Sequence, residues 1–169
     1  MAALGRGELG CGDLEMRIDR DGQWYYRGSR IDRLPLVRLF ASVLHRAENG
    51  DHWLITPVER GRIEVEDVPF TIVGAEAMGE GRARSVRLHS NLGELTTLDR
   101  DHPLTLRRQP GGLVPYLRVR GRLEARVVSR VYYELVELGQ PAESDPDLFG
   151  LWSEGQFFPL GRLDEDASA

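Results

Sequence analysis

The chain has 169 residues, a formal net charge of −5 and 41% hydrophobic residues, and its length suits one domain or two small ones. A chain of this size buries enough surface to fold without a metal ion or a disulfide, and its acidic balance argues against nucleic-acid binding, which requires a positive field. All 22 basic residues are arginine, which excludes functions that need a lysine, such as a Walker A loop or a Schiff-base enzyme.

Cysteine usage and hydrophobicity indicate a cytoplasmic protein. Cys11 is the single cysteine, so no disulfide can form within the chain, as is usual in a reducing compartment. The first residues lack the apolar core of a signal peptide, and no apolar run approaches the roughly 18 residues of a membrane helix. We therefore expect a cytoplasmic protein that does not associate with a membrane.

The first elements are expected to be strands. Residues 1–13 contain four glycines and no periodicity, which predicts a flexible tail. Residues 14–20 alternate apolar and polar side chains up to Asp21-Gly22, a hairpin signal. The aromatic residues within 23–27 favour a second strand.

A helix is expected next. Pro35 suits its first turn, the apolar residues from 36 to 44 recur at helical spacing, and Asn49-Gly50 supplies a stop signal. Residues 52–56 are typical of a strand.

The remainder is rich in strand signals, which run to about residue 106 and resume at 113–123. A second amphipathic helix over 127–138 ends at Gly139, a typical C-terminal cap. A polar linker, 140–147, precedes a segment with three large aromatic side chains, and these indicate that the segment docks on the body of the protein.

These elements predict an α+β fold with two β-rich halves, each with one main helix. We place the boundary between the halves near residues 75–81. The expected parts are a tail (1–13), an N-terminal α+β domain (14–78), a C-terminal domain (79–139), and a docked aromatic segment with an acidic tail (140–169).

Motifs for catalysis and cofactor binding are missing or lie in the wrong context. Residues 5–10 match G-x-G-x-x-G, but a dinucleotide site needs a strand before the motif and a helix after it. The four histidines and Cys11 do not have the spacing of a zinc motif, and a polar hairpin loop explains residues 99–102 (DRDH) better than a metal site does. No G-x-S-x-G elbow occurs. We predict no catalytic residue, no metal and no cofactor.

Three arginines at period two suggest a candidate binding surface. Arg118, Arg120 and Arg122 share one face of their predicted strand, with Leu117 and Leu123 on the other. Guanidinium groups this close together require solvent, internal carboxylates or an anionic ligand. The sequence leaves these alternatives open.

An acidic face mirrors this surface. Glu64 and Glu66 alternate with Ile63 and Val65. Paired carboxylates can perform acid–base catalysis when burial separates their pKa values, although a solvated face or a contact with the arginines explains them more simply. The tetrapeptides GRIE (61–64) and GRLE (121–124) match too weakly to establish a repeat.

Longer stretches carry a family resemblance. DGQWYYRGSRIDRLPLVRLFASVL, ITPVERGRIEVEDVPF and GLWSEGQFFPLG resemble the bacterial family known as domain of unknown function 1285, with matches from about Asp21 to Gly161. The resemblance implies a duplicated β-rich core whose C-terminal domain is similar to a pleckstrin-homology fold, a bent sheet capped by a helix. It also implies a nucleotide-like ligand between the two domains and a role in signal transduction, with no catalytic residues attached.

The residues and the resemblance together predict a ligand-binding or signal-transduction module for a small anionic molecule. Arginines would bind the anionic group and a tryptophan would stack on a flat ring, although core packing is the simpler role for Trp24 and Tyr26. The predicted ligand-binding residues are Trp24, Arg27, Ser29, Glu59, Glu64, Arg118, Arg120 and Trp152.

Two other functions stay open. An enzyme would need buried carboxylates among Glu59, Glu64 and Asp67. A protein-interaction scaffold, for which a protein partner is possible, would need an exposed apolar patch. The residues considered for that patch are Leu151, Trp152 and Phe158.

Overall fold

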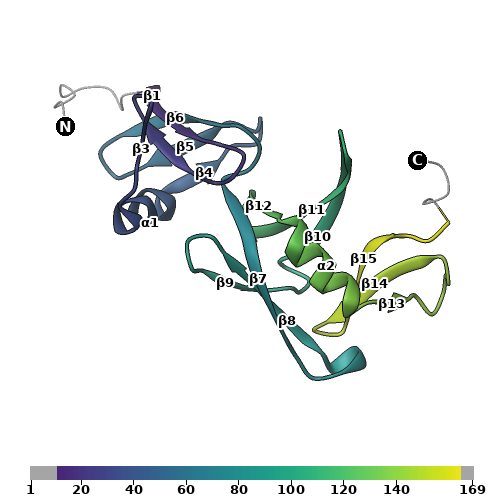
Figure 1. The fold of residues 1–169 in the computed structure, drawn as a ribbon. Coiled ribbons are helices and arrows are strands. Elements are labelled where there is room, and N and C mark those ends of the chain that lie inside the picture. The colour runs from purple at the N-terminus through teal and green to yellow at the C-terminus, as the bar shows by residue number, and fades with distance from the viewer. Residues whose placement is uncertain (1–10, 165–169) are drawn as a thin grey trace. The chain divides into compact units, whose positions relative to one another are not determined.

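The fold is α+β, as the sequence predicts. A computed structural model describes residues 11–164, which contain two α-helices, one 3-10 turn (η1, Gly81–Ala83) and fifteen strands in three sheets (Figure 1). The chain divides into two compact units. Unit 1 comprises residues up to Pro69 together with Gly121–Leu123, and unit 2 comprises Phe70–Arg120 and the chain from Glu124 onward.

Unit 1 is a six-stranded sheet with one helix. In sheet order its strands are β3 (Ser29–Arg30), β2 (Trp24–Tyr26), β1 (Cys11–Ile18), β6 (Arg60–Val65), β5 (His52–Ile55) and β4 (Leu44–Arg46). The helix α1 (Leu34–Ser42) connects β3 to β4. The central pair β1–β6 is parallel and the other pairs are antiparallel.

The predicted hairpin at Asp21-Gly22 is confirmed, and Asp19 fixes it. One Asp19 carboxylate oxygen accepts the N–H groups of Asp21 and Gln23, and the other accepts the hydroxyl of Tyr25 at 3.0 Å. Burial alone would raise the pKa of Asp19, but these hydrogen bonds to its ionised form outweigh it and the pKa is lowered. Gly22 has a φ of 81°, which a side chain would disfavour.

The expected helix is shorter than its apolar pattern predicts. It ends at Ser42, and the residues after it form β4, which pairs with β5. Asn49-Gly50 therefore forms the β4–β5 turn and does not end the helix, with the Asn49 side chain accepting the N–H of Asp51. Leu44 is 1% exposed and packs in the core from a strand. The helical spacing of apolar residues therefore continues beyond the last residue of the helix.

Unit 2 contains the second six-stranded sheet. Its strands, in sheet order, are β10 (Leu104–Gln109), β11 (Gly112–Arg120), β12 (Leu123–Val127), β7 (Phe70–Met78), β8 (Ser85–Ser90) and β9 (Leu95–Thr97). The helix α2 (Ser129–Glu137) follows β12 and packs against β7. A bulge between Ile72 and Gly74 interrupts β7 and bends the strand.

The two sheets repeat one topology, which confirms the expected duplication. In each unit a three-strand meander is followed by a second one, and the first strand pairs in parallel with the last, as β1 with β6 and β7 with β12. GRIE lies on β6, the last strand of its sheet, and the LE of GRLE begins β12, the last strand of the other. The tetrapeptides therefore occupy related places that their letters alone could not establish.

The boundary between the units differs from the predicted range of 75–81. β7 extends from Phe70 to Met78 and belongs to the second sheet, so the units separate between Pro69 and Phe70. The glycines at 79 and 81 instead form the turn between β7 and β8. Residues 11–13 of the predicted tail belong to β1, and residues 1–10 lie outside the described part.

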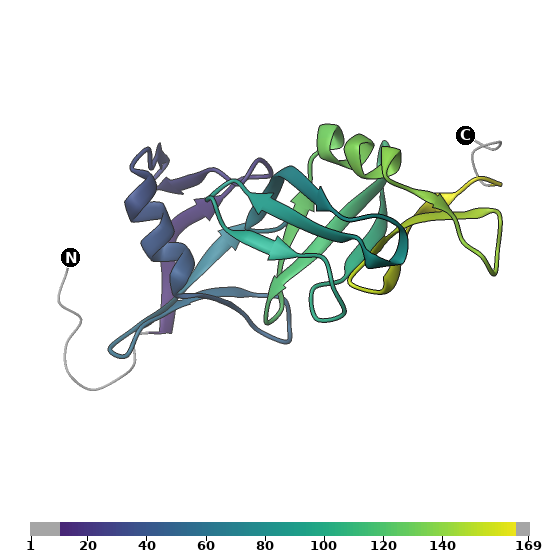
Figure 2. The same ribbon diagram turned by 90° about the horizontal axis from the view of Figure 1, so that it is seen from below.

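The aromatic segment docks on unit 2, as expected. It forms a third sheet of β13 (Gln140–Pro141), β14 (Leu148–Ser153) and β15 (Gln156–Arg162), which contacts α2, β8 and β10 (Figures 1 and 2). The buried Ser153 hydroxyl donates to the Leu98 carbonyl at 2.6 Å and accepts the Val86 N–H at 3.0 Å. Leu151 and Phe158 are 0% and 6% exposed, so the proposed interaction patch is part of the core.

Replacing Ser153 with alanine should destabilise the protein by about 1–3 kcal/mol, because it leaves a buried donor and a buried acceptor unpaired. Urea unfolding followed by circular dichroism measures the change. The control is Ser29→Ala on exposed β3, which should stay within about 0.5 kcal/mol of wild type. Equal stabilities for the two variants would contradict the role assigned to Ser153.

Candidate functional site

The arginine face lies on β11 and contains two of the three predicted arginines. Arg118 is exposed and Arg120 half-buried, while Leu117 and Val119 between them are 0% and 7% exposed. This alternation follows from the period of a strand. Arg118 forms no ion pair with any carboxylate of the described residues, so its guanidinium is available to a ligand.

Arg122 does not belong to this face, contrary to expectation. β11 ends at Arg120, and Gly121, with a φ of 52°, turns the chain into β12. Arg122 lies in that turn, where its guanidinium is 3.1 Å from the Glu48 carboxylate. The arginine face therefore consists of Arg118 and Arg120.

A pocket of about 520 Å³ lies beside Arg120 in unit 2. β9 and the residue before it supply Glu94, Leu95, Thr96 and Thr97, the β9–β10 turn supplies Asp99 and His102, and β11 supplies Val119 and Arg120. The backbone N–H of Arg118 donates to the Pro103 carbonyl, so Arg118 lies opposite the residue that follows His102. The pocket thus combines a guanidinium, an imidazole and two threonines with the carboxylates of Glu94 and Asp99, which lie beside Arg120 and His102.

Contacts within unit 2 hold Arg120 at the pocket wall. Its guanidinium lies 5.8 Å from the centre of the Phe70 ring, and one nitrogen is 3.6 Å from a Glu94 oxygen. A charge pair at that distance and half exposed to water is weak. An anion that approached Arg120 with better geometry could therefore compete with Glu94 for it.

The Asp99 carboxylate organises the turn that supplies His102. One oxygen accepts the N–H groups of Asp101 and His102 and lies 2.9 Å from the His102 Nδ1. Burial would raise the pKa of Asp99, but the hydrogen bonds from the His102 side chain and backbone outweigh it and the pKa is lowered. The DRDH tetrapeptide is a structured hairpin turn, as expected, and it also orients an imidazole at a pocket.

The two predicted stacking residues are already packed. Trp24 is 1% exposed and stacks on Phe40 with ring centres 6.1 Å apart, so it belongs to the core of unit 1 and cannot receive a ligand. Trp152 is half-buried between the Arg82 guanidinium, 4.7 Å from its ring, and Phe157, whose ring is 5.5 Å away. The core alternative for Trp24 is therefore correct.

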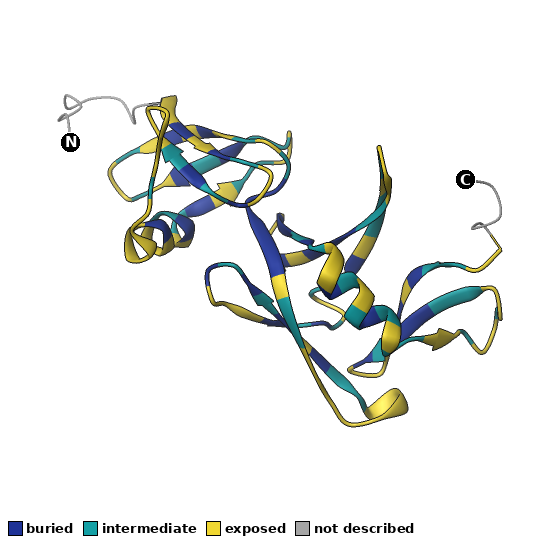
Figure 3. Ribbon diagram, viewed as in Figure 1, coloured by how far each residue is buried: buried dark blue, intermediate teal, exposed yellow. Residues whose placement is uncertain are grey.

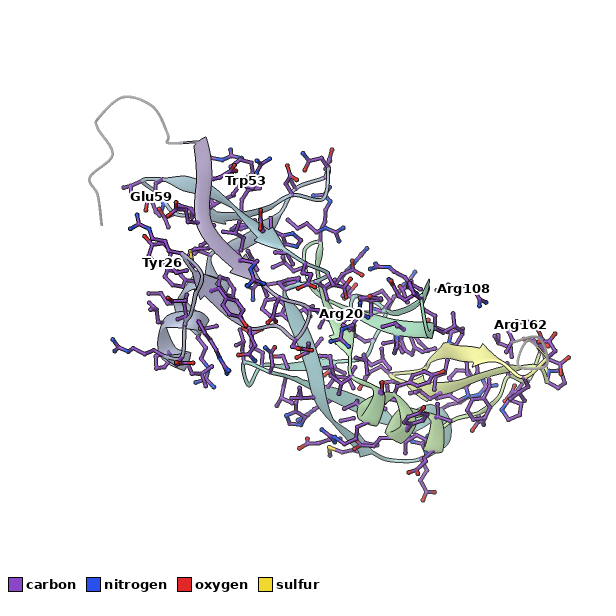
Figure 4. All side chains as sticks on the ribbon, turned by 45° about the horizontal axis from the view of Figure 1, so that its top comes forward. Arg20, Tyr26, Trp53, Glu59, Arg108 and Arg162 are labelled. Atoms are coloured by element: carbon purple, nitrogen blue, oxygen red, sulfur yellow. The ribbon has the colours of Figure 1, made fainter. Side chains whose placement is uncertain are left out.

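The other four predicted residues belong to unit 1 and do not form one cluster. Arg27 pairs with Glu15 at 2.7 Å and Ser29 is exposed on β3. Glu59 lies in the turn before β6, where its N–H donates to the Thr56 hydroxyl (Figure 4). Glu64 is exposed on β6.

Arg27 and Glu64 line an open groove of about 1400 Å³ along β1 and β6. Five carboxylates and three arginines line it, and two of these arginines are paired: Arg27 with Glu15, and Arg62 with Asp13 at 2.7 Å and Asp51 at 3.7 Å. The acidic excess disfavours an anionic ligand. Among Glu59, Glu64 and Asp67, Glu64 alone lines this groove, so the carboxylates required for the enzyme alternative do not converge there.

The residues that the sequence did not single out are the pocket threonines. The run ELTTLDRDHP contains all the β9 and turn residues of the pocket, but only the sheet brings β11 beside them. In the described part of the chain, no group of three or more His, Cys, Asp or Glu side chains is arranged to hold a metal ion. The same residues include no helix long and apolar enough to cross a membrane.

Comparison with known families identifies the family of this chain. Residues 9–68 match the domain described as "Domain of unknown function (DUF1285), N-terminal domain", and residues 69–160 match "Protein of unknown function (DUF1285), C-terminal domain". The chain belongs to the DUF1285 family. The division between these matches, at 68/69, agrees with the division between the two units.

Two solved structures of DUF1285 family proteins are similar to the chain. One, from Silicibacter pomeroyi DSS-3, is 37% identical, covers 95% of this chain and 87% of its own, and has a TM-score of 0.86. The other, from Shewanella baltica OS155, is 26% identical, covers 73% of this chain and 91% of its own, and has a TM-score of 0.60. No curated protein matched the chain.

The Asp99 turn gives a pH prediction. Because the pKa of Asp99 is lower in the folded chain than in the unfolded chain, where it is about 3.9, its stabilisation is complete above about pH 4 and is lost as the pH falls through the folded value. Asp99→Asn should therefore lower the free energy of unfolding by about 1–3 kcal/mol at pH 7 and by less at pH 2.5.

Urea titrations at the two pH values measure this difference. Asp101→Asn, in the same turn but exposed, is the matched control and should change stability little at either pH. A loss for Asp99→Asn that was the same at both pH values would show that its charge is not what stabilises the turn.

Proposed function

We propose that this DUF1285 protein is a cytoplasmic module that binds a small anionic, nucleotide-like ligand and passes on a signal through that binding. The observation that carries the proposal is the arginine face of β11, where Arg118 is exposed and Arg120 lines the 520 Å³ pocket. The family resemblance supports the ligand class. A position between the two domains stays a prediction.

Two carboxylates also line the pocket, but Glu94 is a weak partner of Arg120 and Asp99 is engaged by His102, so the groups an anion requires are still present. The Arg120 guanidinium would bind a phosphate or carboxylate with two parallel hydrogen bonds. The hydroxyls of Thr96 and Thr97 would donate to the remaining oxygens, and Arg118 on the same face would add charge. His102, oriented through its Nδ1 by Asp99, presents its other ring nitrogen as a further polar contact.

Neither predicted tryptophan lines the pocket, and this limits how the pocket could recognise a flat ring. Trp24 is buried, so a base or other flat ring would have to rest on apolar groups of the pocket itself, such as Leu95 and Val119. The anionic group would then account for most of the affinity. This arrangement favours recognition of the charged part of the ligand over recognition of a particular base.

Thermal unfolding with a panel of anions tests the proposal. Inorganic phosphate, nucleoside mono-, di- and triphosphates and cyclic nucleotides are each added, and at least one should raise the melting temperature, because a ligand that binds the native state stabilises it. Arg120→Ala should weaken that ligand roughly 10- to 100-fold by titration calorimetry. Arg118→Ala should weaken it less.

Arg33→Ala is the matched control, because Arg33 is an exposed arginine of unit 1, far in sequence from the pocket. It should leave both the melting shift and the affinity unchanged. If no anion shifts the melting temperature, or if Arg120→Ala binds as tightly as wild type, the proposed function is wrong.

A further inference from the structure

The helix α1 leaves large apolar side chains in water. Of its nine residues only Val37 and Ala41 are buried, whereas Leu34, Leu36 and Leu39 are 40%, 36% and 61% exposed. Figure 3 shows the alternation of buried and exposed positions along this helix. A surface helix of a soluble domain normally presents polar residues on its outer side.

These side chains form a stripe. Leu36, Leu39 and Phe40 have the spacing i, i+3 and i+4, so they lie on one side of the helix. Phe40 anchors the stripe to the core through its stacking on Trp24. The apolar surface therefore continues from the core of unit 1 out to Leu39, the most exposed leucine of the helix.

The helix of unit 2 offers a direct comparison, because it belongs to a sheet of the same topology. There, Val131 and Leu135 are fully buried, and the third sheet covers α2 through β14. The Tyr132 hydroxyl also donates to the Leu160 carbonyl at 2.7 Å. Within the described residues of unit 1, no additional sheet of this kind is present.

Positive charge borders the stripe. Residues 24–43 contain four arginines and one acid, and two of these arginines, Arg27 and Arg30, already pair with Glu15 and Asp32. Arg33, the N-cap residue three positions before Leu36, is exposed and forms no ion pair with a described carboxylate. No acidic side chain lies in the first turn of α1, so the positive end of the helix dipole is not neutralised by the helix itself.

We propose that this face of α1 docks an acidic amphipathic segment of a partner protein. Apolar side chains of the partner would cover Leu36 and Leu39, and its carboxylates would pair with Arg33 and with the first turn of α1. A helix laid against such a stripe is an established mode of recognition. This site is in unit 1, and it does not depend on the anion pocket of unit 2.

An anionic membrane surface fits these features less well. Three exposed leucines on a nine-residue helix provide little apolar area for insertion, and stable attachment to a membrane generally takes a second signal. The net charge of −5 also opposes approach to an acidic lipid surface.

A designed peptide tests the proposal on the full chain. The probe is a fluorescein-labelled peptide of about 16 residues, long enough to become helical on binding, with leucines at i, i+3 and i+7 spacing and glutamates elsewhere. Fluorescence anisotropy should show saturable binding that weakens with added salt. Leu39→Gln and Arg33→Glu should each weaken it by about tenfold or more.

Three controls make the result specific. Met78→Gln changes an equally exposed apolar residue of unit 2 and should leave binding intact, and circular dichroism should show that all variants melt as wild type does. The same peptide with lysine in place of glutamate should not bind. Vesicles with about one third phosphatidylserine should not retain the protein by flotation.

The proposal is wrong if the acidic peptide does not bind, if the lysine peptide binds as tightly, or if Leu39→Gln has no effect. Vesicle binding that was lost in Leu39→Gln would assign the face to a membrane instead. Sedimentation velocity tests the last alternative, in which a second copy of the chain covers this face. Concentration-dependent dimers that Leu39→Gln abolishes would support that alternative and contradict the proposal.

Discussion

The parallel pairing of the first and last strands of each unit is the constraint on which the rest of the structure depends. β1 pairs with β6, and β7 pairs with β12. Parallel neighbours cannot be joined by a tight turn, and in each sheet the other four strands lie between the two paired strands along the chain. At the first pair, a Cβ added at Gly61 would lie 2.3 Å from the Leu14 side chain, which would have to move.

The placement of the helices explains why two sheets of one topology present different surfaces. α1 lies between the two meanders of its sheet, whereas α2 follows the last strand. The chain after α2 therefore continues directly into the sheet that covers it, and the Leu138 carbonyl at its end accepts a hydrogen bond from Arg84 at 2.7 Å. The chain after α1 returns to its own sheet as β4, which leaves the outer leucines of α1 exposed.

Sequence patterns predicted which helices and strands form better than they predicted where each one ends or how the elements pack together. The Asp21-Gly22 hairpin, the second helix and the docking of the aromatic segment could all be predicted, because local turn chemistry and periodicity determine them. The end of α1 could not, because Leu44 continues the helical spacing while its burial comes from pairing with β5. The spacing of apolar residues indicates which side chains are buried, but it does not indicate whether a helix or a strand carries them.

The residues of the candidate site were also only partly predictable from the sequence. The alternation along β11 correctly placed Arg118 and Arg120 on one face, but a turn at Gly121 removed Arg122. Thr96, Asp99 and His102 lie within seven residues of one another, but β9 and β11 are not neighbours in the sheet, so only the folded unit brings them beside Arg120. Trp24 suited a core better than a ligand site, and its burial confirms the core.

The arginines of the chain differ in what already occupies their guanidinium groups, and this difference decides which can bind a ligand. Arg107 pairs with the buried Glu124 and lies 4.4 Å from the Tyr116 ring, and Arg162, near the C-terminal end in Figure 4, is held by Asp145 and Asp164. A ligand would have to break these contacts. Arg118 forms no ion pair with a described carboxylate, and for this reason we propose the face of β11 as the anion site.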